Sequence, residues 1–423
     1  MGSRIPGFYR LPPEARLSAL EDALGVDLES FRRPSLDLKT ADLMVENVIG
    51  TFGLPNAVGI NLLVNGRDVV VPMVVEEPSV VAAVSNMARL TRLAGGIHAE
   101  GDESVMTGQV QVICEGDPSE AAEKLRAGLD ELAPLAQGVH PRLEERGGGL
   151  RGMEVRIVDY DEPGQVAERF VVLHFHLDCV DAMGANMVNT IAERLAPTVE
   201  RITGERVGLR ILSNLADKRL ARARVRLRPE HLDHGDLNGE EVAQGIAAAY
   251  RFAYADPYRA ATHNKGIMNG VDAVAIATGN DWRAIEAGAH AWASRDGRYR
   301  SLSRWTVEDG VLVGEVELPL QVGTVGGPIR VHPTVKSNLD LMGVTRAREL
   351  ASLMAAVGLA QNLGALRALA TEGIQQGHMR MHARNVAASA GATAEQVPEV
   401  AARLFEAQDF SEDYARRVLA ELS

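Results

Sequence analysis

The sequence predicts an α+β protein: a large helix-rich domain, a smaller domain of the ferredoxin-like type inserted into it, and a mobile helical flap at the C-terminal end. Patterns between residues 105 and 212 follow the order βαββαβ, the ferredoxin-like split unit. Apolar helical and strand patterns continue on both sides of that stretch. Gly373 and Gly377 form a potential hinge before a polar, alanine-rich end. The expected boundaries are 1–104 and 211–373 for the large domain, 105–210 for the small domain and 374–423 for the flap.

The first part of the large domain carries helical patterns over residues 14–33 and 39–51. Asp68–Val75 is an apolar run that predicts a buried strand. The segment Glu76–Ser79 then opens a helix that runs to Leu93, because proline favours a first helical turn. Acidic residues at a helix start commonly pair with the helix dipole, and two of them at a strand-to-helix junction are also candidates for chemistry.

The remaining elements are predicted from alternation for strands and from a 3.6-residue period for helices. In the insert we expect strands at 105–114, 153–158, 169–178 and 207–212, and helices at 118–137 and 181–203. After it we expect strands at 223–228 and 313–320, and helices at 240–253 and 346–370.

Composition excludes several classes of protein. The net charge of −13 argues against nucleic acid as the main partner, so an anionic substrate needs a local cluster of basic residues. Two cysteines, Cys114 and Cys179, give no disulfide framework and indicate a reducing cytoplasm. The first residues lack the apolar core of a signal peptide, and no apolar run reaches the roughly 18 residues of a membrane span. The sequence predicts a soluble, cytoplasmic protein without a membrane or nucleic-acid partner.

The segment Asp256–Gly270 carries the densest set of functional side chains. Between apolar flanks it holds an arginine, a histidine, two asparagines and a lysine, and Asp281 follows shortly after it. Such a set of cations, amides and a carboxylate is suited to bind an anionic substrate and to polarise a carbonyl group.

Asp181–Asn186 is a second candidate, because small residues at the start of a helix let a ligand approach free N–H groups. This arrangement suits a pyrophosphate group. Tight packing at the start of the helix is an alternative explanation of the same pattern. Neither GxGxxG after a strand nor GxxxxGK[ST] occurs. Gly323–Pro328 taken alone is typical of a turn.

Other chemistries find little support in the sequence. Three histidine pairs, 174/176, 231/234 and 378/382, have no HExxH or CxxC beside them, so we expect no metal site. No GxSxG motif provides a hydrolase nucleophile. Cys179 is expected to be a buried core residue. His378 follows the glycine hinge, where it is either an exposed surface residue or a proton donor that swings into a site.

Taken together these segments resemble hydroxymethylglutaryl-coenzyme A (HMG-CoA) reductase, in its soluble bacterial and archaeal class. The resemblance extends over nearly the whole chain. It is carried, in order, by Glu46–Gly50 with Leu54-Pro55, Val75–Ser79, Asp181–Asn186, Arg210–Asp217, Asp256–Gly270, Gly279–Arg283, Gly323–Gly327, Gly358–Gly364 and Gly377–Met379.

The resemblance implies reduction of HMG-CoA to mevalonate and free coenzyme A by two hydrides from NADPH or NADH, without a metal. It implies that Lys265 stabilises the oxyanion, that Glu77 donates a proton, that Asp281 tunes this pair and that His378 protonates the departing thiolate. Five positions match residues around the HMG group: Ser79, Asn214, Arg259, Asn269 and Gln361. Four match the nicotinamide-nucleotide loop of the ferredoxin-like domain: Asp181, Met183, Gly184 and Asn186.

One departure concerns the choice of cofactor. NADH-using degradative members of the family carry an aspartate after the first helix of the small domain, and this sequence has His140 there, with Arg142 nearby. Without the carboxylate, a 2′-phosphate is not repelled, and His140 or Arg142 is placed to bind it. We therefore expect NADPH, or use of both cofactors.

The resemblance also implies a homodimer, or an assembly of dimers, with active sites shared between subunits. Two alternatives remain. The same residues serve mevalonate oxidation with NAD in a catabolic cell, and a non-catalytic protein that binds coenzyme A or a nucleotide would keep the same scaffold. The second alternative predicts loss of the catalytic set, which is intact here: Glu77, Lys265, Asp281 and His378.

Overall fold

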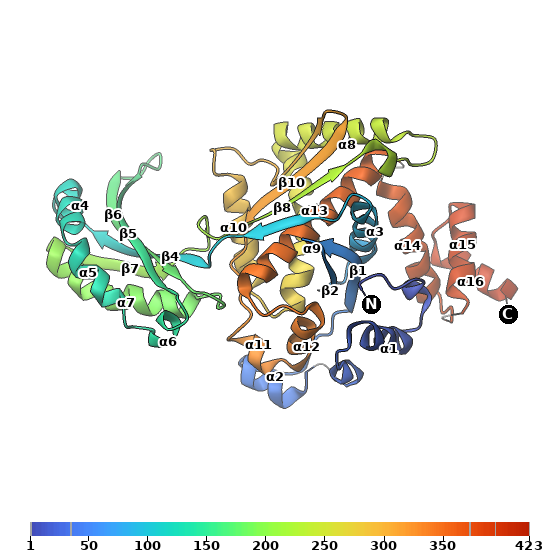
Figure 1. The fold of residues 1–423 in the computed structure, drawn as a ribbon, viewed down its shortest axis with the longest axis horizontal. Coiled ribbons are helices and arrows are strands. Elements are labelled where there is room, and N and C mark those ends of the chain that lie inside the picture. Colours follow the sequence, from blue (N-terminus) through green and yellow to red (C-terminus); the bar gives the residue numbers. More distant parts are fainter. Residues whose placement is uncertain (1, 34–35, 372–373, 394, 423) are drawn as a thin grey trace.

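The computed structural model describes residues 2–33, 36–371, 374–393 and 395–422, with side chains omitted at 328 and 374–381. Figure 1 shows three bodies side by side: a small domain that contains β4–β7, a central large domain, and a group of C-terminal helices on the opposite side. The predicted α+β class is confirmed by this mixture of helices and sheets. The domain boundaries stay a prediction.

The large domain is assembled from both ends of the insert. Its N-terminal part contains η1 (Phe8–Arg10), α1 (Pro13–Leu24), η2 (Glu29–Arg32), α2 (Leu38–Met44), β1 (Asn56–Val64), β2 (Arg67–Val74), α3 (Val80–Arg92) and β3 (His98–Gly101). Its second part contains β8 (Leu220–Leu227), η3 (Pro229–His231), α8 (Gly239–Ala255), α9 (Pro257–Ala277), α10 (Trp282–Ala293), β9 (Ser303–Glu308), β10 (Val311–Pro319), α11 (Pro328–Val331), α12 (Pro333–Met342) and α13 (Ala347–Ala370).

Two antiparallel sheets and the helix α13 form the core of the large domain. β1 and β2 form a hairpin, and the second sheet has the order β3-β8-β10-β9. The α13 helix is apolar around most of its circumference, and sixteen of its residues are buried. By length and composition it is the one helix of the described chain that could cross a membrane. Here, however, it packs against the helices α3, α8 and α9 and against the two central strands of the sheet, β8 and β10. This is the environment of a core helix.

The small domain contains β4 (Val105–Ile113), α4 (Pro118–Ala127), α5 (Leu129–Ala136), α6 (Pro141–Glu144), β5 (Gly149–Tyr160), β6 (Glu168–Asp178), α7 (Ala185–Thr203) and β7 (Arg206–Leu212). Its sheet has the order β5-β6-β4-β7 with every pair antiparallel, as the βαββαβ unit requires. Apolar residues of alternate strand positions, such as Met106, Val110 and Phe175, pack with α4, α5 and α7 into a core of their own.

Three predicted helices end earlier than expected or are interrupted. The helix predicted over 14–33 ends at Leu24, because Gly25 adopts a left-handed conformation that terminates it. The helix predicted over 39–51 ends at Met44. The helix predicted over 118–137 is two helices, interrupted at Gly128, whose tight contact with Ile202 excludes a side chain.

The C-terminal helices are α14 (Ile374–Ser389), α15 (Val397–Ala407) and α16 (Glu412–Leu422). They share a separate apolar core that includes Ala383, Val400, Leu404 and Val418. Contacts of α14 with α13 join this group to the large domain. Of the two glycines of the predicted hinge, Gly373 lies outside the described residues, whereas Gly377 lies within α14.

Candidate active site

Glu77 lies in a turn between β2 and α3. The helix begins at Val80, after the segment Glu76–Ser79 that the sequence predicts to open it, so Glu77 precedes it and is no member of its first turn. Ser79, the residue before the helix, has a left-handed backbone with φ of 77° and does not cap the helix with its side chain. A non-glycine residue in this region costs of order 1–3 kcal/mol and is found preferentially at functional sites. The turn therefore has the strained backbone that is typical of functional sites.

Lys265 lies in the middle of α9, which forms from the densest functional segment of the sequence. The helix begins at Pro257, and the Asp256 side chain caps it by accepting a hydrogen bond from the Arg259 backbone N–H at 3.1 Å. Lys265 Nζ lies 2.5 Å from Glu77 Oε2. Asn269, one turn further along the helix, donates to Glu77 Oε1 at 3.4 Å. Three predicted site residues are thus brought together by two elements far apart in sequence.

The Lys265–Glu77 pair remains open to solvent and ligand. Its side chains are 58% and 31% exposed, respectively. An ammonium group in such a position can stabilise negative charge on a substrate oxygen, and a neighbouring carboxyl group can supply a proton. The arrangement suits the reduction of a carbonyl group.

The two residues beside Lys265 have a structural task. His263 and Asn264 are buried in the face of α9 that packs on the core. His263 Nε2 lies 2.6 Å from Ser303 Oγ, and Asn264 binds the backbone of Arg300 and Leu302. Burial lowers the pKa of His263 to about 3, so its ring is neutral at neutral pH. These residues hold the helix in place and leave Lys265 on its free face.

Asp281 lies at the start of α10, where its side chain caps the helix by accepting from the Ala284 backbone N–H at 3.1 Å. Its carboxylate lies 3.8 Å from Arg283. Among the described residues it makes no hydrogen bond or ion pair with Lys265 or Glu77. Its tuning of that pair stays a prediction.

The predicted HMG-binding residues lie on several elements, and Asn269 is the one with a hydrogen bond to the pair among the described residues. The half-buried Arg259 guanidinium has no hydrogen-bond or ion-pair partner in the described part of the chain, and burial lowers its pKa. Gln361 is buried on α13 against Gly270 of α9, and its Oε1 is without a partner among the described residues. Asn214 lies in the connection after β7, where its carbonyl accepts from Gln321 Nε2 at 3.1 Å. Unpaired polar groups of this kind are available for a ligand.

The predicted cofactor loop lies between the small and large domains. Asp181 Oδ1 accepts from the Ala347 backbone N–H at 3.0 Å, so this residue is tied to α13. The helix α7 begins only at Ala185, because Gly184 has a left-handed φ of 104°. A side chain on Gly184 would collide with Cys179 Sγ at 2.3 Å. The loop therefore keeps a close-packed backbone before the free N–H groups of a nineteen-residue helix, which fits a dinucleotide phosphate.

Three further residues are predicted to contact the cofactor: Asn186, His140 and Arg142. Asn186 is exposed in the first turn of α7. His140 lies close to that turn, because its Nε2 is 3.2 Å from the Met187 carbonyl oxygen. Arg142 is exposed on α6, and no described residue pairs with it. The two residues predicted to bind a 2′-phosphate therefore differ, because His140 contacts α7 whereas Arg142 has no described partner.

Arg219, which no predicted motif includes, connects the predicted cofactor loop to the large domain. Only 3% of it is exposed, and its guanidinium donates to the carbonyl oxygens of Met183 at 3.1 Å, Ala182 at 3.3 Å and Val322. Burial lowers its pKa to about 10. The neighbouring glycine-rich loop reinforces this junction, because the Thr324 backbone N–H donates to the Asp181 carbonyl oxygen at 2.9 Å. Arg219 lies in the turn before β8, outside every motif and element predicted from the sequence, so no local pattern indicated this role.

A cavity of about 1030 Å³ opens beside Glu77. One wall is formed by the N-terminal segment and the other by the start of β1 and one face of α3. Residues that line it include Phe8, Tyr9, Arg16, Leu17, Pro55, Glu77, Ser79, Ser85, Arg89, Thr334 and Asn385. No motif in the N-terminal segment indicates that it contributes to a pocket.

His378 falls within α14, but its side chain lies outside the described residues, so its role stays a prediction. Elsewhere, His174 and His176 lie 3.6 and 3.5 Å from the same oxygen of Glu154. No group of three or more potential metal-ligating side chains occurs in the part of the chain that the structure describes.

Comparison with known proteins agrees with this geometry. The family model of hydroxymethylglutaryl-coenzyme A reductase matches residues 12–383. The 3-hydroxy-3-methylglutaryl-coenzyme A reductase of Archaeoglobus fulgidus is 48% identical over 100% of this chain and 95% of its own length. A probable reductase of Borreliella burgdorferi is 37% identical over 81% of this chain and 77% of its own length.

Solved structures agree in fold as well as in sequence. A reductase from Streptococcus pneumoniae matches with a TM-score of 0.83 and 43% identity over 99% of both chains. The class II enzyme of the same organism, bound to NADPH in open conformations, matches with a TM-score of 0.81 and 44% identity over 97% of this chain and 100% of that one. The chain belongs to the hydroxymethylglutaryl-coenzyme A reductase family of oxidoreductases.

Proposed function

We propose that the protein reduces HMG-CoA to mevalonate with two hydrides. The observation that carries this proposal is the contact of Lys265 with Glu77, flanked by Asn269. Overall, HMG-CoA, two NAD(P)H and two protons give mevalonate, coenzyme A and two NAD(P)⁺. The nicotinamide supplies hydride when bound, and the chain supplies positive charge, protons and orientation.

Lys265 stabilises the oxygen of the thioester carbonyl as it becomes negative after the first hydride. The resulting mevaldyl-CoA hemithioacetal breaks its C–S bond to give mevaldehyde. The thiolate that leaves takes a proton from His378. After the second hydride, Glu77 protonates the new alkoxide to give the alcohol. Asp281 influences the protonation of the Lys265–Glu77 pair from the start of α10.

Binding of the substrate requires a charge clamp and a large pocket. We infer that Arg259 pairs with the free carboxylate of the HMG group through two hydrogen bonds, because its guanidinium has no described partner. Ser79, Asn214, Asn269 and Gln361 complete the contacts with that group. The cavity beside Glu77 then receives the coenzyme A part of the substrate.

For the cofactor we propose NADPH, or use of both nicotinamides. The loop formed by Asp181, Met183, Gly184 and Asn186 binds it, and Arg142 contacts the 2′-phosphate while His140 supports the first turn of α7. The NADPH-bound structure of the Streptococcus pneumoniae relative is consistent with this choice. The site does not distinguish biosynthetic reduction from the oxidation of mevalonate with NAD, because one set of residues serves both directions.

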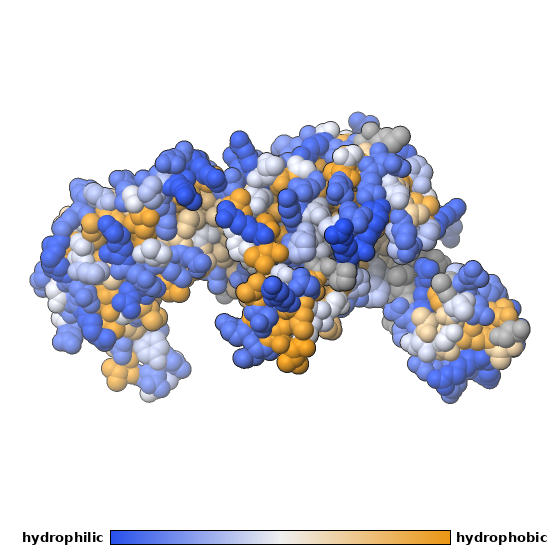
Figure 2. Space-filling view, turned by 90° about the horizontal axis from the view of Figure 1, so that it is seen from below, coloured by the Kyte–Doolittle hydropathy of each residue, from blue (hydrophilic) through white to orange (hydrophobic). Residues whose placement is uncertain are grey.

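We further propose a cytoplasmic homodimer, or an assembly of dimers, with active sites shared between subunits. Two observations support it. The segment after α2 exposes apolar side chains, with Ile49 100% and Phe52 90% accessible, and Figure 2 shows an apolar area over this part of the molecule. Among the described residues, the cofactor loop makes no hydrogen bond or ion pair with Lys265 or Glu77 of the same chain. In a dimer, the cofactor loop of the partner subunit can complete the site instead. Light scattering on the wild type and on Ile49→Asp tests this directly.

The decisive experiment follows nicotinamide absorbance with HMG-CoA while free thiol is counted. We expect two equivalents of cofactor oxidised for each coenzyme A released, with NADPH preferred. Arg142→Ala should lower the ratio of kcat/KM for NADPH to that for NADH more than His140→Ala does. The absence of oxidation with either cofactor would overturn the proposed reaction in favour of a non-catalytic scaffold.

A further inference from the structure

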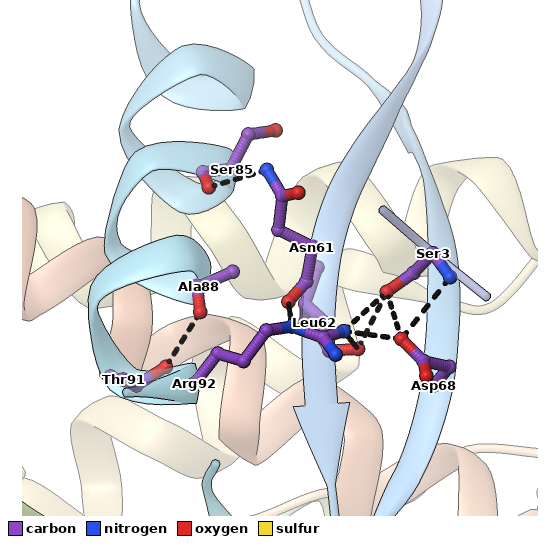
Figure 3. Close-up of polar contacts among 8 residues, drawn as sticks. All are labelled: Ser3, Asn61, Leu62, Asp68, Ser85, Ala88, Thr91 and Arg92. Carbon is purple, nitrogen blue, oxygen red and sulfur yellow. Dashed lines mark hydrogen bonds and ion pairs between the residues drawn. The ribbon is translucent and has the colours of Figure 1, made fainter. Parts of the chain in front are cut away.

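A cluster of polar contacts fixes the first residues of the chain to the large domain. Ser3 is fully buried, and its Oγ lies 2.7 Å from Asp68 Oδ1 and 2.9 Å from the Leu62 carbonyl oxygen. Its backbone N–H donates to the same carboxylate oxygen at 3.2 Å. The Ser3 carbonyl oxygen accepts from the Asn61 N–H at 3.0 Å. Figure 3 shows these groups converging between β1, β2 and the end of α3.

Arg92 joins the three elements at this point. Its guanidinium forms an ion pair with Asp68, donates to Ser3 Oγ at 2.9 Å and reaches the Asn61 carbonyl oxygen through Nε at 3.0 Å. The Asn61 carbonyl is available because β1 has an irregularity between Gly59 and Leu62, where Asn61 takes a left-handed φ of 68°. Gly2 fits beside the carboxylate only without a side chain, since a Cβ would lie 2.6 Å from it.

The same helix connects this cluster with the candidate active site. Arg92 is the last residue of α3, and Glu77 and Ser79 immediately precede its first turn. Between them the helix presents Ser85 to the cavity, and Ser85 also holds β1 by accepting from the Ile60 N–H at 3.2 Å. A thirteen-residue helix is about 20 Å long, so both ends are parts of one rigid element.

The segment that follows Ser3 forms the opposite wall of the cavity. Phe8, Tyr9, Arg16 and Leu17 line it from this side, and Phe8 packs in a small apolar core with Leu20, Leu28, Val70 and Leu341. The distance between the two walls is therefore set by that core and by the polar cluster where the segment meets α3.

We propose that Ser3, Asp68 and Arg92 form a clamp that positions segment 3–17 as a wall of the coenzyme A cavity, and thereby sets the affinity for the coenzyme A part of the substrate. This inference rests on the proposed function. The three are positioning residues, since none of them lines the cavity. Hydride transfer itself takes place at the Lys265 end and does not depend on the clamp.

The test compares two matched variants. Asp68→Asn removes the negative charge from the clamp. Asp102→Asn is the control, because it removes the negative charge from an ion pair with Arg222 in the β3–β8 part of the sheet. The two aspartate side chains are equally exposed, at 38% each. We expect Asp68→Asn to raise KM for HMG-CoA by roughly 3- to 10-fold, which corresponds to the free energy of one or two hydrogen bonds. The kcat of the variant should stay within about 2-fold of the wild-type kcat. KM for mevaldehyde, which lacks coenzyme A, and for NADPH should not change. Ser3→Ala should act in the same direction, and Arg92→Lys should be milder than Arg92→Ala.

Calorimetric titration with free coenzyme A gives a readout that does not depend on turnover. We expect Asp68→Asn to weaken this binding by the same factor as KM, and Asp102→Asn to leave it unchanged. Equal constants for the two variants would overturn the clamp. So would a lower Tm accompanied by equal losses with HMG-CoA and mevaldehyde, because that pattern belongs to general destabilisation. A wild type that binds coenzyme A but does not reduce HMG-CoA would overturn the proposed reaction alone.

Discussion

Lys265 Nζ and Glu77 Oε2 lie 2.5 Å apart, although 188 residues separate them in sequence. One comes from the middle of a helix and the other from a strained turn before another helix. Because Asn269 also reaches Glu77, the carboxylate is held by two side chains of α9 at once. The contact brings an amino group and a carboxyl group to the same place, which suits a carbonyl reduction.

Replacing Lys265 with alanine should abolish both hydride steps. In the proposed mechanism the ammonium stabilises the oxyanion of the thioester and that of the aldehyde, and loss of one such donor costs about 10²- to 10³-fold in rate. Nicotinamide oxidation with HMG-CoA and with mevaldehyde measures the two steps separately. Substantial activity of the variant with either substrate would remove the assigned role.

His378→Ala should impair reduction of the thioester far more than reduction of mevaldehyde. Only the thioester reaction releases a thiolate, and general acid catalysis of that departure contributes typically 10²- to 10⁴-fold. Comparing kcat for the two substrates is sufficient. Equal losses would mean that His378 does not protonate coenzyme A.

Arg259→Lys should raise KM for HMG-CoA while leaving KM for NADPH unchanged. Lysine keeps the positive charge but loses the planar pair of donors, so the carboxylate of the HMG group is bound less tightly by about 1.5–3 kcal/mol. Competition by mevalonate, which carries the same carboxylate, should weaken to a similar degree. An unchanged inhibition constant for mevalonate would argue that another residue binds the carboxylate.

Asp272→Asn should change the dependence of stability on pH. Asp272 on α9 and Glu286 on α10 are hydrogen-bonded carboxyl groups, and burial together with Glu286 raises the pKa of Asp272 far above its usual range. Glu286 in turn lies 2.6 Å from His290. An acid with a raised folded-state pKa contributes stability that is complete below its unfolded pKa, near 4, and is lost as the pH rises through the folded value.

The free energy of unfolding of the wild type should therefore decrease between pH 5 and pH 8, by at most about 1.4 kcal/mol per pH unit from this group. Asparagine still donates a hydrogen bond to Glu286 and has no proton to lose. Denaturation of the variant should depend less on pH, and at pH 8 its stability relative to the wild type should be higher than at pH 5. Parallel pH profiles of the two proteins would show that Asp272 is ionised in the fold.

Much of this architecture was predictable because its signals are local. The βαββαβ order follows from alternation and helical period, and the family resemblance rests on short motifs such as Asp256–Gly270. Helix ends were less predictable, since Gly25 and Gly128 act through backbone conformation and close packing. The strand β1 was not predicted; its pairing is irregular between Gly59 and Leu62, which interrupts the alternation of a regular strand.

The site was predictable as a set of residues but not as a shape. Nothing local relates Ser3 to Arg92, or Arg219 to the carbonyl groups of the cofactor loop. His263 and Asn264 were grouped with Lys265 by the sequence, although packing directs them into the core. Contacts between segments that are distant in sequence decide which side chains face the site and which face the core. Local sequence patterns do not reveal these contacts.

The pairing of Gly101 in β3 with Ala221 in β8 has a consequence for how the chain can be cut. The whole small domain leaves and re-enters the large domain between these two residues, and the Asp102 N–H donates to the Leu220 carbonyl oxygen at 2.8 Å. Antiparallel partners lie about 5 Å apart, a gap that a two-residue hairpin turn closes. The large domain is interrupted in sequence but continuous in space, so a short turn in place of the insert would give a single uninterrupted chain with the Lys265–Glu77 contact intact.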